Sequence, residues 1–154
     1  MRICIGGRNN IAVDICKYLL GTLPKDCIYV IPGRNDDGKD NYQRSFLKFA
    51  RNSGLKVLLL QEIYDWEDLI FLSLEFDRII HPSKFKSKQL YNIHFSLLPA
   101  YKGVYTSALP LRKGERYGGV TLHYIERGID TGDIIDQVKF EIPNDYKALD
   151  MYLR

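Results

Sequence analysis

Short apolar runs that alternate with helix-like spacing limit what this chain can fold into. The first run covers residues 2–6 and ends in two glycines, and apolar residues from Ile11 to Leu20 then recur at intervals that place them on one face of a helix. Residues 28–31 form a second apolar run, which a Pro-Gly pair ends. Because strands that alternate with helices build parallel sheets, the sequence predicts an α/β fold with a Rossmann-like, mainly parallel sheet flanked by helices.

The rest of the chain continues this alternation. We expect the first helix to end at Gly21. The later elements are expected as a helix marked by residues 42–50 that ends at Gly54, a strand over 57–60, a helix capped by Asp65 that carries 69–72, a strand over 77–80 and a short helix over 84–90. A strand from 91, a short helix over 106–113, strands over 120–125 and 134–142, and a helix from 144 follow. One loop joins the last two strands, which suits an antiparallel edge. The 154 residues are predicted to form a single domain, 1–154, truncated in its C-terminal helix.

The composition is typical of a soluble domain. The chain carries 22 basic and 19 acidic residues, a formal net charge of +3, and no long basic stripe, which argues against nucleic acid as a partner. No apolar run is long enough to span a membrane, and the N-terminus does not resemble a signal peptide. The three cysteines match no zinc spacing and are expected to be reduced. The sequence thus predicts a cytoplasmic protein with no membrane partner and no metal.

Two polar residues and one carboxylate stand out. Asn92 and His94 lie two residues apart in the apolar run from 91, so strand alternation places them on one face of the sheet. The run stops at Ser96, and ligands bind at the carboxyl ends of strands in open α/β sheets. We therefore expect an amide, an imidazole and the later carboxylate of Asp130 to meet at one point.

Each of these residues also has a purely structural interpretation. Asn92 and His94 suit strand-end positions bonded to the backbone, and Asp130 suits a turn. His123 lies in an apolar run and is expected to pack. A metal site formed by His81, His94 and His123 is disfavoured, because each histidine comes from a different strand and no ligand spacing supports it.

The sequence resembles the folate-dependent formyltransferase family, which includes the glycinamide ribonucleotide, methionyl-tRNA and nucleotide-sugar N-formyltransferases. The likeness covers most of the chain, is strongest over 77–142, and is closest to the nucleotide-sugar enzymes. Phe95 stands where the family usually has proline. The motifs that carry the resemblance are Asn92-Ile-His94, Ser96-Leu-Leu-Pro99, Lys102-Gly103, Gly-Val-Thr-Leu-His-Tyr and Gly128-Ile-Asp130-Thr-Gly132-Asp133.

The resemblance implies a formyltransferase catalytic core with Asn92, His94 and Asp130 as catalytic residues. Formyl transfer to an amine passes through a tetrahedral oxyanion, to which an amide and an imidazole donate hydrogen bonds while a carboxylate orients the imidazole. The resemblance also implies 10-formyltetrahydrofolate as the donor. The residues expected to bind its pteridine follow the predicted fourth strand or precede the catalytic carboxylate: Ile80, His81, Pro82, Phe85, Gly128 and Ile129.

Members of the family differ mainly in their acceptor. Backbone N–H groups after the first strand favour phosphate, and Arg8 adds a cation that suits a diphosphate, although an ordinary surface charge is an almost equal interpretation of Arg8. The resemblance favours a nucleotide-linked amino sugar, namely a dTDP-linked 4-amino-4,6-dideoxy sugar used in lipopolysaccharide O-antigen synthesis. The residues expected to bind it are Gly7, Arg8, Asn9, Lys102 and Tyr105.

Other functions stay open at this point. One is formyl transfer to a different phosphorylated amine, such as glycinamide ribonucleotide. Others are a folate- or nucleotide-binding module without catalysis, and a metal-dependent hydrolase. A homodimer of a longer chain is also compatible with the sequence. A dinucleotide cofactor is not supported, because the Gly-x-Gly-x-x-Gly fingerprint is absent.

Overall fold

The structure is a computed structural model that describes residues 1–153. The chain divides into two compact units, Met1–Tyr91 and Asn92–Arg154, which we call unit 1 and unit 2. The hydrogen-bonded strands follow the order β3-β2-β1-β4-β5-β6-β7. Strand β1 pairs in parallel with β2 and β4, β2 pairs in parallel with β3, and β6 and β7 are antiparallel, which confirms the predicted mainly parallel α/β sheet.

Unit 1 is built around the strand β1 (Arg2–Gly7). It pairs in parallel with β2 (Ile28–Pro32) on one side and with β4 (Leu69–Leu74) on the other, and β2 pairs in parallel with β3 (Lys56–Val57). The chain therefore leaves β1 toward one side of the sheet and later returns to its other side. That reversal is a topological switch point, where open α/β sheets bind ligands beyond the carboxyl ends of their strands.

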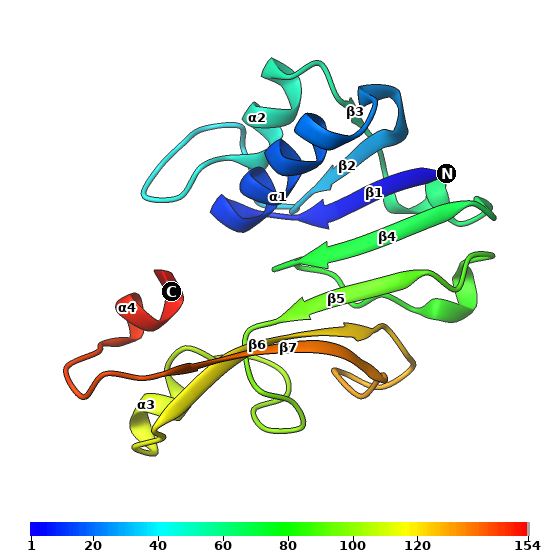
Figure 1. Cartoon of the computed structure of the whole chain (residues 1–154). Coiled ribbons are helices and arrows are strands. Elements are labelled where there is room, and N and C mark those ends of the chain that lie inside the picture. The colour runs from blue at the N-terminus through cyan, green and yellow to red at the C-terminus, as the bar shows by residue number, and fades with distance from the viewer. Residues whose placement is uncertain (154) are drawn as a thin grey trace. The chain divides into compact units, whose positions relative to one another are not determined.

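Two helices cover the strands of unit 1. Helix α1 (Asn9–Thr22) packs against β1 and against α2 (Phe46–Asn52), as Figure 1 shows. The apolar face of α1 turns Ala12, Val13 and Cys16 into the core, where they meet fully buried side chains of the strands such as Ile5. Three short 3₁₀ helices complete the unit: η1 (Lys25–Cys27), η2 (Leu60–Ile63) and η3 (Pro82–Lys84).

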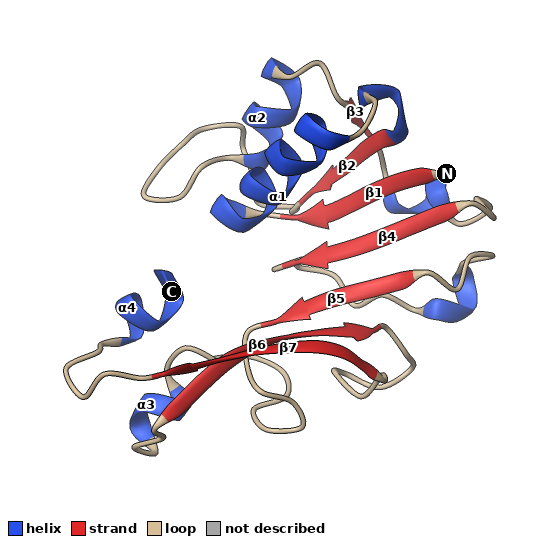
Figure 2. Cartoon of the chain, viewed as in Figure 1, coloured by secondary structure: helices blue, strands red, loops and turns tan. Residues whose placement is uncertain are grey.

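Unit 2 is mostly strand and loop (Figure 2). The strand β5 (Leu90–His94) begins in unit 1 and ends in unit 2. The hairpin of β6 (Tyr117–Tyr124) and β7 (Ile134–Glu141) confirms the predicted antiparallel edge. The helices are short: α3 (Leu109–Arg112), with Pro110 in its first turn as the sequence allowed, and α4 (Ala148–Leu153).

Several sequence-based element predictions were wrong. Residues 69–72 belong to the strand β4, which lies beside β1, and not to a helix. Residues 77–80 form no strand, because the Asp77 carboxylate accepts the Arg34 N–H and the Arg78 guanidinium donates to the Pro32 carbonyl, which ties this segment to the end of β2. Residues 84–90 contain no α-helix.

Two boundaries also differ from the prediction. Helix α1 continues through Gly21 to Thr22, and the Leu23 N–H closes its last turn on the Leu19 carbonyl. Of the strand expected over 57–60, only Val57 belongs to a strand, the edge strand β3, and its side chain is 42% exposed. Within residues 1–153, no helix combines the length and the apolar character that crossing a membrane requires.

Candidate active site

The side chains of Asn92, His94 and Asp130 meet in unit 2, as the sequence analysis expected. Asn92 and His94 both come from β5, and Asp130 comes from the loop between β6 and β7. The Asn92 amide nitrogen lies 3.3 Å from Asp130 Oδ1, and His94 Nδ1 lies 3.4 Å from Asp130 Oδ2. The predicted alternation along the strand is therefore confirmed, because both side chains reach the same carboxylate.

The hydrogen-bond partners of His94 define its protonation at one nitrogen. Its Nε2 lies 2.7 Å from the backbone carbonyl of Tyr101, which can only accept, so we assign a proton to Nε2. Its Nδ1 faces the Asp130 carboxylate at 3.4 Å. The 3.4 Å contact is longer than an ordinary hydrogen bond, which leaves Nδ1 able to turn toward a ligand.

A second histidine, His123, is buried as expected, and it also faces the same carboxylate, a contact that the sequence did not predict. Its Nδ1 donates to the Tyr124 carbonyl at 2.8 Å, while its Nε2 lies 3.1 Å from the Asn92 amide nitrogen and 3.5 Å from Asp130 Oδ1. Because Asn92 Nδ2 can only donate, this network assigns Nε2 of His123 as an acceptor. The two imidazoles therefore play different parts around one carboxylate.

Asp130 is held as an anion. Burial by itself raises the pKa of this carboxyl, but the two imidazoles that face it and the hydrogen bond from the Gly103 N–H outweigh burial and hold the pKa below its usual range. Its backbone lies in the left-handed region at φ 49°. The loop is tight, because a Cβ on Gly132 would lie 1.9 Å from the Tyr124 carbonyl oxygen.

A buried hydroxyl fixes the turn that follows β5. Thr121, fully buried on β6, donates to the Ser96 carbonyl at 2.6 Å and accepts from the Leu98 N–H at 3.1 Å. The Gln137 amide donates to the same hydroxyl at 2.9 Å and to the Leu98 carbonyl at 2.9 Å. Side chains of the hairpin thus set the path of the chain directly after His94.

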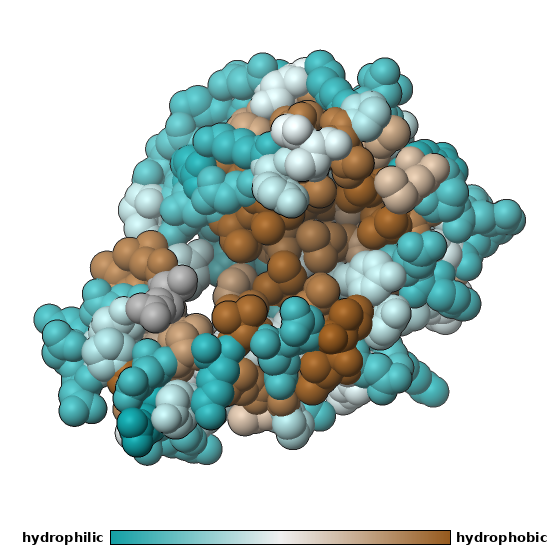
Figure 3. Space-filling view, in the orientation of Figure 1, coloured by the Kyte–Doolittle hydropathy of each residue, from teal (hydrophilic) through white to brown (hydrophobic). Residues whose placement is uncertain are grey.

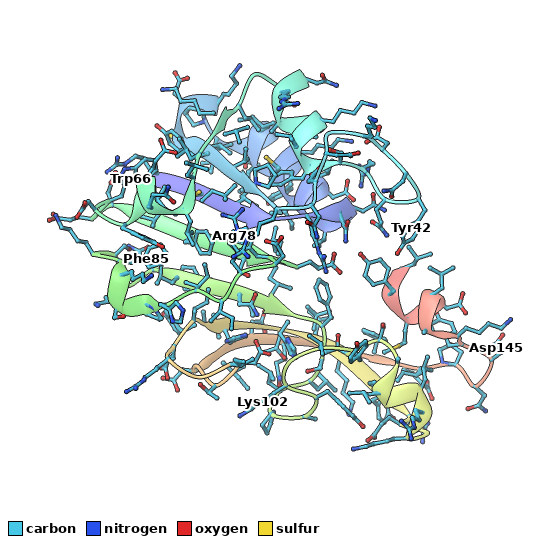
Figure 4. The ribbon with its side chains drawn as sticks, turned by 180° about the vertical axis from the view of Figure 1, so that it is seen from behind. Tyr42, Trp66, Arg78, Phe85, Lys102 and Asp145 are labelled. Carbon is cyan, nitrogen blue, oxygen red and sulfur yellow. The ribbon has the colours of Figure 1, made fainter. Side chains whose placement is uncertain are left out.

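The other predicted site residues of unit 2 lie on exposed loops. Lys102 is exposed on the loop after β5 (Figure 4), and Tyr105 on the same loop is 75% exposed. Gly128 is exposed, and Ile129, directly before Asp130, presents 60% of its surface. All four are accessible, and their roles in ligand binding stay predictions.

The predicted phosphate-binding residues lie in unit 1 at the carboxyl end of β1. Gly7 is the last residue of the strand and is buried, and Arg8 is exposed at the N-cap of α1. Asn9 opens the helix with φ 64°, and its amide donates to Glu75 Oε2 at 2.7 Å. The Arg8 side chain makes no capping hydrogen bond, and the first turn of α1 contains no acidic residue. The N-terminal end of this helix therefore keeps its positive potential.

The predicted folate-binding residues of unit 1 differ in accessibility. Ile80 and Phe85 are buried, and the ring of Phe85 packs edge-on against Tyr64 at 4.8 Å between centroids. His81 is exposed and Pro82 is half-buried. Phe85 therefore contributes to the core of unit 1, and its contact with folate stays a prediction, as do those of the other three residues. Among residues 1–153, no three His, Cys, Asp or Glu side chains are grouped so as to hold a metal ion.

An amide donor, an imidazole with one firmly placed proton and an ionised carboxylate suit acyl transfer. The amide and the imidazole can stabilise negative charge on a carbonyl oxygen, and the carboxylate stabilises the imidazolium. These groups and the fold together indicate the class of protein to which the chain belongs. Residues 67–154, more than half of the chain, match the family model described as Formyl transferase. The chain belongs to the formyl transferase family.

Two solved structures resemble the chain strongly over 99% of its length. One is WlaRD, described as a sugar 3N-formyl transferase in the presence of dTDP and 5-N-formyl-THF, with 51% identity and a TM-score of 0.96. The other is an N-formyltransferase from Helicobacter canadensis in complex with folinic acid and dTDP-3-aminofucose, with 49% identity and a TM-score of 0.96. The chain spans 56% and 57% of those two chains.

A more distant relative is a methionyl-tRNA formyltransferase from Chlorobium luteolum. It is 28% identical over the whole of this chain, which covers 54% of that protein. The chain thus spans about half the length of the relatives it matches.

Proposed function

We propose that the protein transfers a formyl group from 10-formyltetrahydrofolate to the amine of a dTDP-linked amino sugar. The single observation that carries this proposal is the convergence of Asn92, His94 and Asp130 in unit 2. The two half-identical structures are described with folates and dTDP compounds, which supports the same donor and acceptor classes for this chain.

In the proposed reaction the acceptor amine attacks the formyl carbon of the donor and forms a tetrahedral oxyanion. The Asn92 amide donates to that oxygen, at the expense of its contacts with His123 and Asp130. His94 in its imidazolium form then gives a proton to N10 of the folate as the C–N bond breaks. The amine loses one proton, which returns to the imidazole directly or through water, so the protons balance.

The Asp130 carboxylate acts mainly by its charge in this scheme. A carboxyl whose pKa lies below its usual range stays ionised near neutral pH and is a weak base, so it is a poor final acceptor for the amine proton. Its position 3.4 Å from His94 Nδ1 instead stabilises the cationic imidazole that protonates the leaving nitrogen.

For the donor, we propose that the pteridine contacts His81 and Pro82 of unit 1 and Ile129 of unit 2. The pteridine pocket would also be formed by Ile80, Phe85 and Gly128, through side-chain packing and backbone groups. This assignment is supported by the exposure of His81 and Ile129 and by the family to which the chain belongs.

For the acceptor, we propose that Gly7, Arg8 and Asn9 hold the phosphates while Lys102 and Tyr105 contact the sugar. The start of α1 supports the first part, since its first turn contains no acidic residue and the helix dipole favours anions. The sequence analysis favoured an amine at C4 of the sugar. The two half-identical relatives are described as a 3N-formyl transferase and as a complex with dTDP-3-aminofucose, so the C3 amine must be compared directly.

Mass spectrometry of dTDP-3-aminofucose and of its 4-amino isomer, each incubated with the protein and 10-formyltetrahydrofolate, tests the proposal. We expect a gain of one formyl group on one of the two sugars. Asn92→Ala, His94→Ala and Asp130→Asn should each lower the rate by about 10²–10³ while the protein stays folded. Full turnover by the His94 variant would exclude the proposed mechanism. Formyl transfer to glycinamide ribonucleotide alone would show that this nucleotide, and not a dTDP-linked amino sugar, is the acceptor.

We place the protein in the synthesis of sugar precursors for a surface polysaccharide, inside the cytoplasm. This is supported by the acceptor class named for its relatives. A homodimer of the whole protein stays a prediction, and sedimentation of the purified protein tests it.

A further inference from the structure

A polar cleft in unit 1 lies beyond the carboxyl ends of β1, β2 and β4. Arg8, Gly33 and Asp77 line it just after these strands, and the remaining lining comes mainly from the loop of residues 35–45. Its volume is about 130 Å³, which is about four times the roughly 30 Å³ that a water molecule occupies in the liquid. On the face shown in Figure 3, hydrophilic side chains cover the region of this loop. The cleft is large enough to receive a polar group of phosphoryl size.

Gln43 lies against this cleft with half of its amide unpaired. The residue is 5% exposed, and its Oε1 accepts the Asn10 N–H in the first turn of α1 at 3.1 Å. This bond caps a helix that has no capping side chain of its own, and it fixes which end of the amide is oxygen. Nε2 is therefore the other end, and it is buried without a hydrogen-bond partner. A buried donor left unpaired is costly, and a ligand acceptor would remove that cost.

The acidic groups around the cleft are already engaged by the protein. The Asp36 carboxylate accepts hydrogen bonds from the Ser45 hydroxyl and from the N–H groups of Gly38 and Leu47. The Asp77 carboxylate accepts the Arg34 N–H at 2.7 Å, with the Arg78 guanidinium 3.6 Å away.

The remaining acidic side chain of the cleft, Asp37, accepts a hydrogen bond from the backbone N–H of Lys39.

The basic side chains of the cleft differ in whether they are paired. Arg44 is committed to Asn10 and Asp14 of α1. Arg8 and Lys39 form no ion pair within residues 1–153. Within residues 1–153, Arg8 and Lys39 are thus the basic side chains of the cleft without an ion pair, and with the Gln43 amide they offer donors that suit an oxyanion. Asp77 Oδ1 is also buried there without a hydrogen-bond partner, 3.6 Å from the Arg78 guanidinium.

We propose that Gln43 and Lys39 form, with Arg8, the subsite that binds the diphosphate of the acceptor. Gln43 has two tasks in this subsite: its oxygen caps α1, and its nitrogen donates to a phosphate oxygen held at the end of the same helix. This inference rests on the proposed acceptor class. It adds two residues of the loop after β2 as determinants of the preference for a diphosphate over a monophosphate.

Equilibrium binding of inorganic pyrophosphate, dTDP and ribose 5-phosphate to the protein, measured by calorimetry, tests the subsite without formyl transfer. We expect pyrophosphate and dTDP to bind more tightly than ribose 5-phosphate. Gln43→Glu keeps an oxygen to cap α1 and replaces the donor with an anion, so it should weaken dTDP binding by at least about tenfold. Because a carboxylate suits a helix N-terminus, the melting temperature should stay the same or rise.

Matched variants separate a direct contact from a general charge effect. Gln61→Glu adds the same charge at an exposed site of unit 1 outside the cleft and should leave dTDP binding unchanged. Lys39→Gln should weaken dTDP binding and reduce its dependence on salt. Unchanged dTDP affinity in Gln43→Glu, or no binding of dTDP to the wild-type protein, would overturn the inference.

The result of these binding experiments can be told apart from the result of the formyl-transfer experiment. Gln43-dependent binding of dTDP in a protein that formylates no amino sugar would support the subsite and contradict the transferase. Formyl transfer to a dTDP-sugar with normal KM in Gln43→Glu would support the transferase and overturn the subsite.

Discussion

The backbone N–H of Gly103 donates a 2.8 Å hydrogen bond to Oδ2 of Asp130. The same loop also accepts from the His94 imidazole, through the carbonyl of Tyr101. Two backbone groups of one loop therefore hold the imidazole and the carboxylate of the candidate site. The loop after β5 thus positions two of the proposed catalytic side chains, although only Lys102 and Tyr105 within it were expected to bind a ligand.

Gly103→Ala should reduce activity by more than its effect on stability explains. Gly103 has φ 86°, a conformation that costs an L-residue about 1–2 kcal/mol, and no atom lies within 4 Å of a Cβ placed there. The strain should move the loop and lower kcat by about 10- to 100-fold. Gly114→Ala is the matched control, because Gly114 has φ 67° and equally open surroundings but no contact with the site.

Urea denaturation and steady-state kinetics on both glycine variants provide the test. We expect similar losses in the free energy of unfolding and a loss of kcat in the Gly103 variant only. Equal kcat values in the two variants would show that the hydrogen bond to Asp130 has no catalytic importance.

Thr121→Val should destabilise the turn that follows His94. The substitution leaves the Leu98 N–H and the Ser96 carbonyl without their buried partner, which should cost about 1–3 kcal/mol of unfolding free energy. Thr121→Ser keeps the hydroxyl and should cost less. Chemical denaturation of both variants checks this, and a valine variant as stable as the serine variant would contradict the role assigned to the hydroxyl.

The sequence was most informative where pattern and local chemistry agree. Alternation along β5 placed Asn92 and His94 together correctly, because a strand has only two faces. The hairpin of β6 and β7 was also predicted, since one glycine-containing loop separates two alternating segments. These features depend on neighbours in the sequence and hardly on the rest of the fold.

The sequence was least informative where only tertiary contacts decide. Leu69–Leu74 is a short apolar run, and such runs fit a buried strand and a buried helix equally well by periodicity. Its place beside β1 makes it a strand. The contact of His123 with Asp130 was not predicted because the sequence neighbours of His123 are apolar, although Thr121 and His123 are both buried polar residues spaced two apart on β6. Two polar side chains on the inner face of a strand were the available signal.

His123→Leu should lower kcat without changing the KM for either substrate. His123 accepts from the Asn92 amide and donates to the Tyr124 carbonyl, so its loss should free Asn92 to adopt other rotamers and cost roughly tenfold in kcat. His123→Gln can place an oxygen near the position of Nε2 and should restore part of the rate. A change confined to KM would instead indicate that His123 binds substrate directly.

The stability that Asp130 provides should disappear in acid. Its pKa is lower in the folded protein than the value of about 3.9 expected in the unfolded chain. Ionised Asp130 therefore stabilises the fold fully above that unfolded value, and the contribution is lost as the pH falls through the folded pKa. The difference in unfolding free energy between wild type and Asp130→Asn should shrink as the pH falls below about 4.

Urea denaturation of wild type and Asp130→Asn above and below about pH 4 measures that difference, with His94 and His123 present in both. Asp145→Asn is a suitable control, because Asp145 is exposed (Figure 4) and its carboxylate accepts no hydrogen bond within residues 1–153. A difference for Asp130→Asn that grows as the pH falls below about 4 would mean that the folded protein prefers the protonated carboxyl. In that case Asp130 would store the amine proton itself, and the imidazolium mechanism proposed for His94 would be wrong.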